Sequence, residues 1–100
     1  MTERKHTIVL LRPNKNTRTY FEYDTVSAAM DGICKMFEKK LKELNPTMTT
    51  LSYDISDLHR YLDSLPQLVA LIQDQSGSYT PHEKDWIKKR VYLHLRNQAS

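Results

Sequence analysis

The sequence of 100 residues predicts an α+β fold: a four-stranded antiparallel sheet with three helices on one face, in the order ββααββα. Two short stretches, residues 7–11 and 68–72, are apolar without polar alternation, which is typical of strands buried on both faces. Three longer stretches repeat apolar residues at helical spacing. Because these helices can cover only one face of the sheet, we expect a homodimer formed through the open sheet face.

The composition is that of a folded, soluble protein with one domain over residues 1–100. Hydrophobic residues make up 39% and charged residues 27% of the chain, and the net charge of +3 is too mild to indicate a nucleic-acid partner. The only cysteine, Cys34, excludes an internal disulfide and fits a reducing compartment. The N-terminal apolar stretch spans about five residues, too few for a signal peptide or a membrane span.

The N-terminal half predicts a hairpin followed by a long helix. A strand over residues 7–11 leads through a turn at residues 13–16 into a strand over residues 17–23, which is rich in β-branched and aromatic residues. Asp24 or Thr25 then caps a helix, which Asn45-Pro46 ends. The apolar positions of this helix recur at helical spacing and are Val26, Met30, Ile33, Phe37, Leu41 and Leu44.

The C-terminal half predicts a short helix, two strands and a final helix. An extended connection over residues 46–53 precedes the short helix, which Asp54 caps with Asp57 in the first turn. Paired carboxylates at this spacing serve capping better than acid–base chemistry. The remaining elements are a strand over residues 68–72, a turn over residues 74–77, a short strand around Tyr79 and a helix that Pro81 opens and that runs through Leu95.

The first strand supplies the predicted dimer interface, His6, Ile8 and Leu10. Side chains alternate along a strand, so these three share one face and residues 7, 9 and 11 share the other. Burying Ile8 and Leu10 is worth roughly 1.5–3 kcal/mol each, and a two-fold axis counts each contact twice. His6 is the histidine that we expect to titrate near the dimer axis.

Seven stretches, in order and over nearly the whole chain, resemble the enhancer of rudimentary family. They are His6-Thr7-Ile8, Arg18-Thr19-Tyr20, Cys34-Lys35-Met36, Asn45-Pro46, Tyr53-Asp54-Ile55-Ser56, Lys84-Asp85-Trp86-Ile87-Lys88 and Leu95-Arg96-Asn97-Gln98-Ala99. The resemblance implies sheet faces that pair into a barrel-like dimer, with Ile8 and Leu10 at its centre. It also implies a non-enzymatic adaptor without cofactors, which is largely nuclear and has the cytoplasm as a second location.

Partners implied by the resemblance are short disordered segments of RNA-processing and gene-expression proteins, with roles in RNA decay, splicing, small-RNA maturation and cell division. RNA contact is expected to be indirect, and no membrane is involved. Two residues depart from the family pattern. Ala70 stands where relatives often carry cysteine, and Phe21 is large where a small residue is common. We expect Phe21 to affect the choice of partner more than the fold.

The sequence contains no convincing catalytic or metal-binding constellation. Cys34 lies at the edge of a helical apolar stripe, so we interpret it as a structural thiol rather than a nucleophile. The histidines lack metal-ligand spacing, and no cysteine pair supports them; they are His6, His59, His82 and His94. We therefore expect no enzyme, metal or cofactor.

Two weaker signals concern partner binding and modification. The broad apolar stripe of the first helix has Ala29 and Met36 at its edge, which indicates a peptide groove, although packing of Met36 under the 46–53 connection explains the pattern equally well. Thr19 is followed by Glu22, the acidic residue that an acid-directed kinase reads, and it is a candidate phosphorylation site.

The rival hypothesis is a direct single-strand RNA binder. It would stack bases on Tyr20, Tyr23 and Tyr79 and use scattered basic residues for the backbone. We interpret the basic cluster at residues 88–90, with Arg96, as a solvated helix face. Trp86 is expected to anchor the core rather than to stack on a base, because it lies among core residues on a helix.

Overall fold

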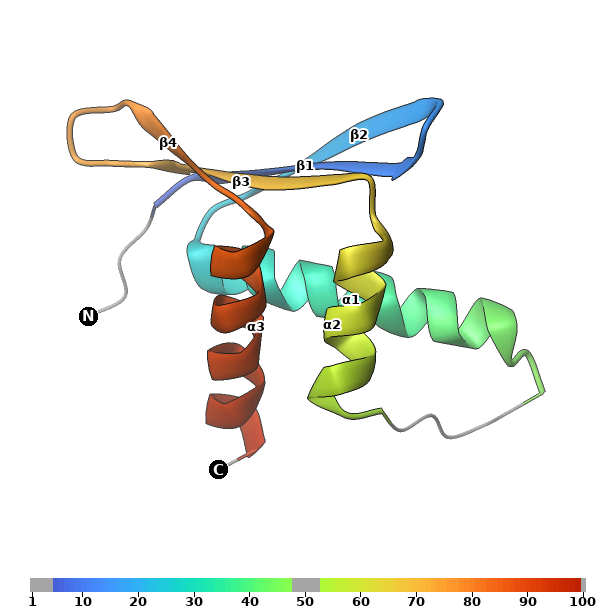
Figure 1. The fold of residues 1–100 in the computed structure, drawn as a ribbon. Helices are drawn as coiled ribbons and strands as arrows, with labels where there is room; N and C mark the ends of the chain where they lie inside the picture. Colours follow the sequence, from blue (N-terminus) through green and yellow to red (C-terminus); the bar gives the residue numbers. More distant parts are fainter. Residues whose placement is uncertain (1–4, 48–52, 100) are drawn as a thin grey trace.

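The computed structural model describes residues 5–47 and 53–99 and confirms the predicted α+β fold (Figure 1). Four strands form one antiparallel sheet in the order β2-β1-β3-β4, and the three helices lie together on one side of it. Most of the predicted connection at residues 46–53 lies outside the described residues. The elements are β1 (Thr7–Asn14), β2 (Thr17–Tyr23), α1 (Val26–Leu44), α2 (Ile55–Ser64), β3 (Gln67–Gln73), β4 (Tyr79–His82) and α3 (Lys84–Ala99).

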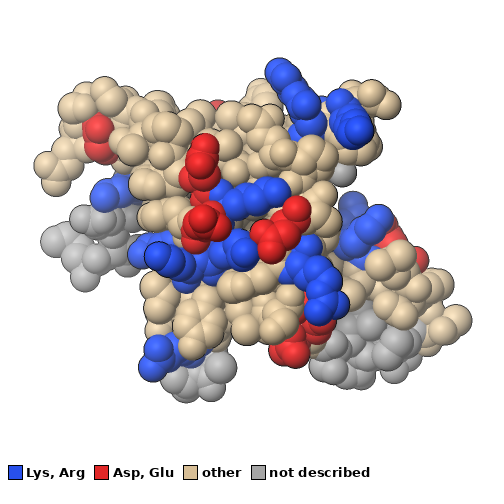
Figure 2. All heavy atoms as spheres, in the orientation of Figure 1, with Lys and Arg blue, Asp and Glu red and all other residues tan. Residues whose placement is uncertain are grey.

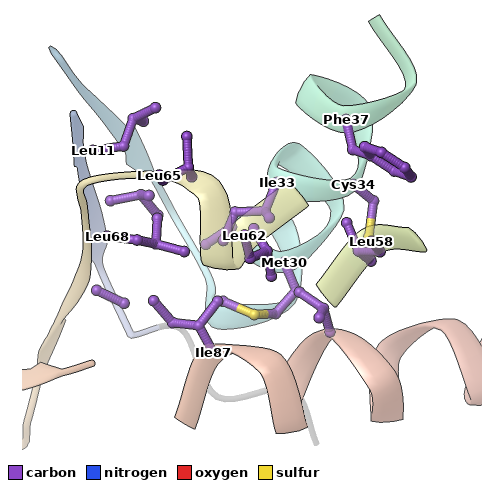
Figure 3. Close-up of a cluster of buried hydrophobic side chains, with 14 residues drawn as sticks. Leu11, Met30, Ile33, Cys34, Phe37, Leu58, Leu62, Leu65, Leu68 and Ile87 are labelled. Atoms are coloured by element: carbon purple, nitrogen blue, oxygen red, sulfur yellow. The ribbon is translucent and has the colours of Figure 1, made fainter. Parts of the chain in front are cut away.

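The two central strands each bury one face against the helices. Val9 of β1 lies opposite Ala70 of β3, and Leu11 lies opposite Leu68; all four side chains are buried. The helices supply the other half of the core, and Figure 3 shows side chains of α1, α2 and α3 meeting those of the strands. Alternation along each strand thus places one apolar set in the core and turns the other set to the opposite face.

Both predicted helix starts in the first two-thirds of the chain are confirmed. Thr25, rather than Asp24, caps α1, because its Oγ1 accepts a hydrogen bond of 2.9 Å from the Ala28 N–H. At α2, the Asp54 carboxylate accepts from the Asp57 N–H at 3.0 Å, and the Asp57 carboxylate accepts from the Asp54 N–H at 3.1 Å. This reciprocal capping box explains both aspartates without any catalytic role.

Replacing Asp54 by alanine is expected to destabilise the protein by about 1 kcal/mol, because the Asp57 N–H loses its acceptor at the start of α2. The measurement is the urea midpoint, with the exposed Asp24→Ala as the matched control. Equal midpoints for the two variants would contradict the capping role.

Two predicted boundaries are wrong. The first strand continues to Asn14, and the turn shrinks to residues 15–16; an irregular register between Leu11 and Asn14 accommodates the proline at position 13, which has no N–H to pair. Pro81 does not open the last helix but lies in β4 opposite Leu71. A proline is tolerated there because β4 is an edge strand, and α3 begins only at Lys84.

Candidate functional site

The face of the sheet that turns away from the helices carries a row of aliphatic side chains, which we call the open sheet face. Ile8 of β1 lies opposite Leu71 of β3, and Leu10 lies opposite Val69. All four are only partly buried, whereas their neighbours on the helical side are covered. Ile8 and Leu10 belong to the predicted interface, whereas Val69 and Leu71 do not, although alternation within the apolar run 68–72 was the available signal.

Aromatic side chains extend this apolar row to both edges of the sheet. Tyr20 of β2 lies opposite Leu10 and is 63% exposed. Tyr79 of β4 lies opposite Gln73 and is 40% exposed. Exposed aromatic residues around an aliphatic centre are typical of protein interfaces. The open sheet face therefore has the composition of a surface that another molecule covers.

His6 connects three strands on this face. Its Nδ1 lies 2.7 Å from the Tyr79 hydroxyl of β4, and the two rings meet edge to face. Its Nε2 lies 4.0 Å from a carboxylate oxygen of Glu22 on β2. His6 immediately precedes β1, and its contacts with Tyr79 and Glu22 place it on the same face as Ile8 and Leu10. Its polar partners make it a rim residue of the open sheet face.

A second surface feature is a groove between β2 and α1, on the helical side of the sheet. Two adjoining hollows, of about 560 and 300 Å³, share Phe21, Met36 and Lys39. The first reaches Tyr23, whose ring lies so close to Gly32 that an added Cβ would be 2.3 Å from its hydroxyl oxygen. We call this feature the β2–α1 groove.

The two helix residues predicted to bind partners have different positions. Met36 lines the β2–α1 groove and also packs against the core. Ala29 is fully buried, so the prediction that it lines a surface groove is wrong. The reason is that the broad apolar stripe of α1 contacts the sheet and the other helices together, and Ala29 lies inside that contact.

Thr19, the candidate phosphorylation site, is partly exposed on β2 and points to the helical side of the sheet opposite Leu11. It lies at the border between the β2–α1 groove and a hollow beside Leu10 and Tyr20. A phosphate there would place about −1.5 to −2 charges next to apolar side chains. Its modification remains a prediction.

Cys34 is buried in the core, as the structural interpretation requires. Burial, reinforced by the nearby carboxylates of Glu38 and Asp31, raises the pKa of the Cys34 thiol to about 11. Because the thiolate is the reactive form, the side chain is poorly suited to nucleophilic chemistry at neutral pH.

Cys34→Ser is expected to leave self-association and partner binding intact while lowering the free energy of unfolding by about 1–2 kcal/mol, since a hydroxyl is then buried among apolar side chains. Urea denaturation and a partner pull-down measure the two effects. A folded Cys34→Ser protein that has lost partner binding would restore a chemical role for the thiol.

The histidines are dispersed, and the described part of the chain contains no group of three or more His, Cys, Asp or Glu residues that could hold a metal ion. His59 Nε2 lies 3.1 Å from the Lys88 carbonyl oxygen, and His94 Nε2 lies 3.5 Å from Asp31. The hydrogen bond from Lys35 and the contact with His94 lower the pKa of Asp31. These contacts join α2 to α3 and α1 to α3, so they are structural.

Trp86 and the basic cluster of α3 lie beside one another. Trp86 packs against the core, stacks on His82 with a ring-centre distance of 4.2 Å, and lies 5.4 Å from the Arg90 guanidinium. Lys88 pairs with Asp63 at 3.1 Å. Figure 2 shows basic side chains interleaved with acidic ones on this side of the molecule. The interpretation as a solvated helix face fits this mixed charge.

The three tyrosines of the RNA-binding hypothesis do not form one platform. Tyr20 and Tyr79 belong to the open sheet face, whereas Tyr23 lies opposite Thr7 on the helical side. Within residues 5–47 and 53–99, no helix is long and apolar enough to cross a membrane.

The fold and the site define a class: small α+β proteins whose single antiparallel sheet keeps an apolar face outside the core of the monomer. Comparison with known proteins identifies the family within that class. The family model described as Enhancer of rudimentary matches residues 3–100, and this chain belongs to the enhancer of rudimentary family.

Its relatives match along nearly their whole lengths. The enhancer of rudimentary homolog of Arabidopsis thaliana is 46% identical, over 96% of this chain and 91% of the relative. The protein enhancer of rudimentary of Drosophila virilis is 42% identical, over 94% and 93%. The homolog of Caenorhabditis elegans is 34% identical, over 95% of both chains.

Proposed function

We propose that this chain is a non-enzymatic homodimeric adaptor that binds short disordered segments of RNA-processing or gene-expression proteins. It acts in the nucleus, with the cytoplasm as a second location, and helps to assemble complexes for RNA decay, splicing, small-RNA maturation and cell division. Membership of the enhancer of rudimentary family is the support for this partner class.

The open sheet face is the observation that carries the self-association. Its centre consists of Ile8, Leu10, Val69 and Leu71, and the flanking aromatic residues Tyr20 and Tyr79 remain exposed in the monomer. A second copy covers this face with an identical one, so every favourable contact occurs twice.

A dimer presents each of its other surfaces twice. Two tethered partner segments are then held at high effective concentration, which raises the avidity of an assembly without a new contact. Binding of disordered segments costs ordering entropy, so each single contact is modest and exchange of partners stays fast.

Sedimentation equilibrium combined with pull-down from nuclear extract tests the proposal. We expect twice the chain mass of 11.8 kDa at micromolar concentration, and bound proteins whose contact segments map by crosslinking to short disordered stretches. A monomer at these concentrations, or bound segments confined to folded domains, would contradict it.

Direct single-strand RNA binding is the alternative, favoured by the exposure of Tyr20 and Tyr79 on one face. A filter-binding titration of the pure protein decides between the two functions. The adaptor is expected to show little RNA affinity, whereas an RNA-binding module would show affinity that falls steeply with salt concentration.

A further inference from the structure

We propose that the β2–α1 groove captures an extended partner segment, which adds as a fifth strand to the outer edge of β2 and carries alternating apolar and acidic side chains. The proposal rests on the proposed adaptor function and identifies its peptide site. It commits to a peptide whose recognition is set by backbone pairing, by the apolar groove and by two lysines.

The free edge of β2 is the first requirement for strand addition. β2 is an outer strand of the sheet, and no described strand pairs with its far side. The Gln73 N–H donates to the His6 carbonyl at 3.0 Å, so the backbone groups of His6, and by alternation those of Ile8 and Leu10, point toward β3.

The same alternation determines which groups of β2 point outward. The backbone N–H and C=O groups of Thr7, Val9 and Leu11 point toward β2. The β2 residues opposite them therefore use their own backbone groups for pairing within the sheet. The backbone N–H and C=O groups of Tyr20 and Glu22 therefore lie on the outer edge. These are the groups that an added strand would pair with.

The groove receives every second side chain of such a strand. Phe21, which is 41% exposed, and Tyr23 point to the helical side of β2 and form one wall. Met36 and Gly32 of α1 form the floor. An added strand would turn alternate side chains toward this apolar floor, where a methionine adapts its shape to different partners. Phe21, one of the two residues that depart from the family pattern, would thus set partner selectivity.

The charge of the groove selects the remaining side chains. Lys35 is paired with Asp31 at 3.0 Å, whereas Lys39 and Lys40 form no ion pair with the residues that the structure describes. Glu43 is the single acidic group at that end of the groove. Acidic residues next to the apolar ones in the partner would therefore meet two ammonium groups, with only the Glu43 carboxylate beside them.

The site is compatible with self-association, because the two surfaces lie on opposite sides of the sheet. Ile8 and Leu10 point to the open sheet face, whereas Phe21 and Tyr23 point to the helical side. A dimer formed through the open sheet face leaves each groove accessible, so partner capture and dimerisation are expected to be separable by mutation.

Panning of a displayed library of random decapeptides on the full-length protein provides the probes. We expect binders enriched in acidic and aliphatic residues, and we expect the bound peptides to slow amide hydrogen exchange at Tyr20 and Glu22. Binding is measured by fluorescence anisotropy with the synthetic peptides. The double variant Lys39→Glu/Lys40→Glu should lose about tenfold in affinity at low salt, and less at high salt.

The matched control is Lys15→Glu/Lys42→Glu, which makes the same change in net charge with exposed lysines outside the groove and should change affinity less than about twofold. Peptides with lysine in place of their acidic residues should regain affinity for the charge-reversed groove. Binders that protect other amides, or that show no acidic preference, would overturn the groove while leaving the adaptor function intact. A library without binders to a confirmed dimer would overturn both.

Discussion

Leu10→Arg is expected to convert the proposed homodimer into monomers. Leu10 lies at the centre of the open sheet face, between Tyr20 of β2 and Val69 of β3. In the proposed dimer, a guanidinium at this position would face the same guanidinium of the second copy. It would also contact the aliphatic side chains of that copy. Removing a charge from water without a partner costs several kcal/mol, which exceeds the contribution of the leucine contacts it replaces. Ile8→Arg is expected to act in the same way.

Sedimentation equilibrium measures this effect, and Leu44→Arg is the matched control. Leu44 is 66% exposed at the end of α1, so the same substitution there should leave the dimer mass unchanged. Where the arginine variants precipitate, Ile8→Ala serves instead and should weaken the dimer by about tenfold or more through lost apolar contact. Dimer mass retained by both arginine variants would refute self-association through this face.

Leu62→Ala is expected to lower the free energy of unfolding by about 3 kcal/mol. Leu62 is fully buried and, with Leu58, attaches α2 to the core. Truncation leaves a cavity and removes transfer free energy, and such substitutions cost about 2–5 kcal/mol. α2 has only 10 residues, too few for a stable isolated helix, so its order depends on these packing contacts.

Urea denaturation at a fixed protein concentration measures the change, because the proposed dimerisation would make apparent stability depend on concentration. Arg60→Ala, on the exposed side of the same helix, is the control and should change stability by no more than about 0.5 kcal/mol. If the two variants unfold at the same urea concentration, Leu62 does not anchor α2.

The two surfaces have separate roles in the proposed adaptor: the open sheet face serves self-association, and the β2–α1 groove serves partner binding. Ile8 and Leu10 of β1 point to the open sheet face, and Phe21 of β2 points to the β2–α1 groove. Loss of dimerisation through Leu10→Arg would therefore reduce avidity but preserve single-site peptide affinity. Measuring both quantities on one variant distinguishes the two roles.

The element types, their order and several caps followed from local sequence patterns. Apolar residues recur every three to four positions in α1 and α2, and the runs at 7–11 and 68–72 are central strands. Local rules did not determine the role of Pro81, because a proline fits an edge strand as well as a helix start. The choice depends on its pairing with β3, which is a long-range contact.

The sequence by itself determined which faces of the strands and helices are apolar, that one sheet face lacks cover, and that no metal-ligand spacing is present. Only the tertiary structure decided that Ala29 belongs to the core, that Val69 and Leu71 join Ile8 and Leu10, and that Phe21 and Met36 share a groove. The reason is physical: periodicity depends on neighbours along the chain, whereas burial and groove formation depend on how distant segments pack.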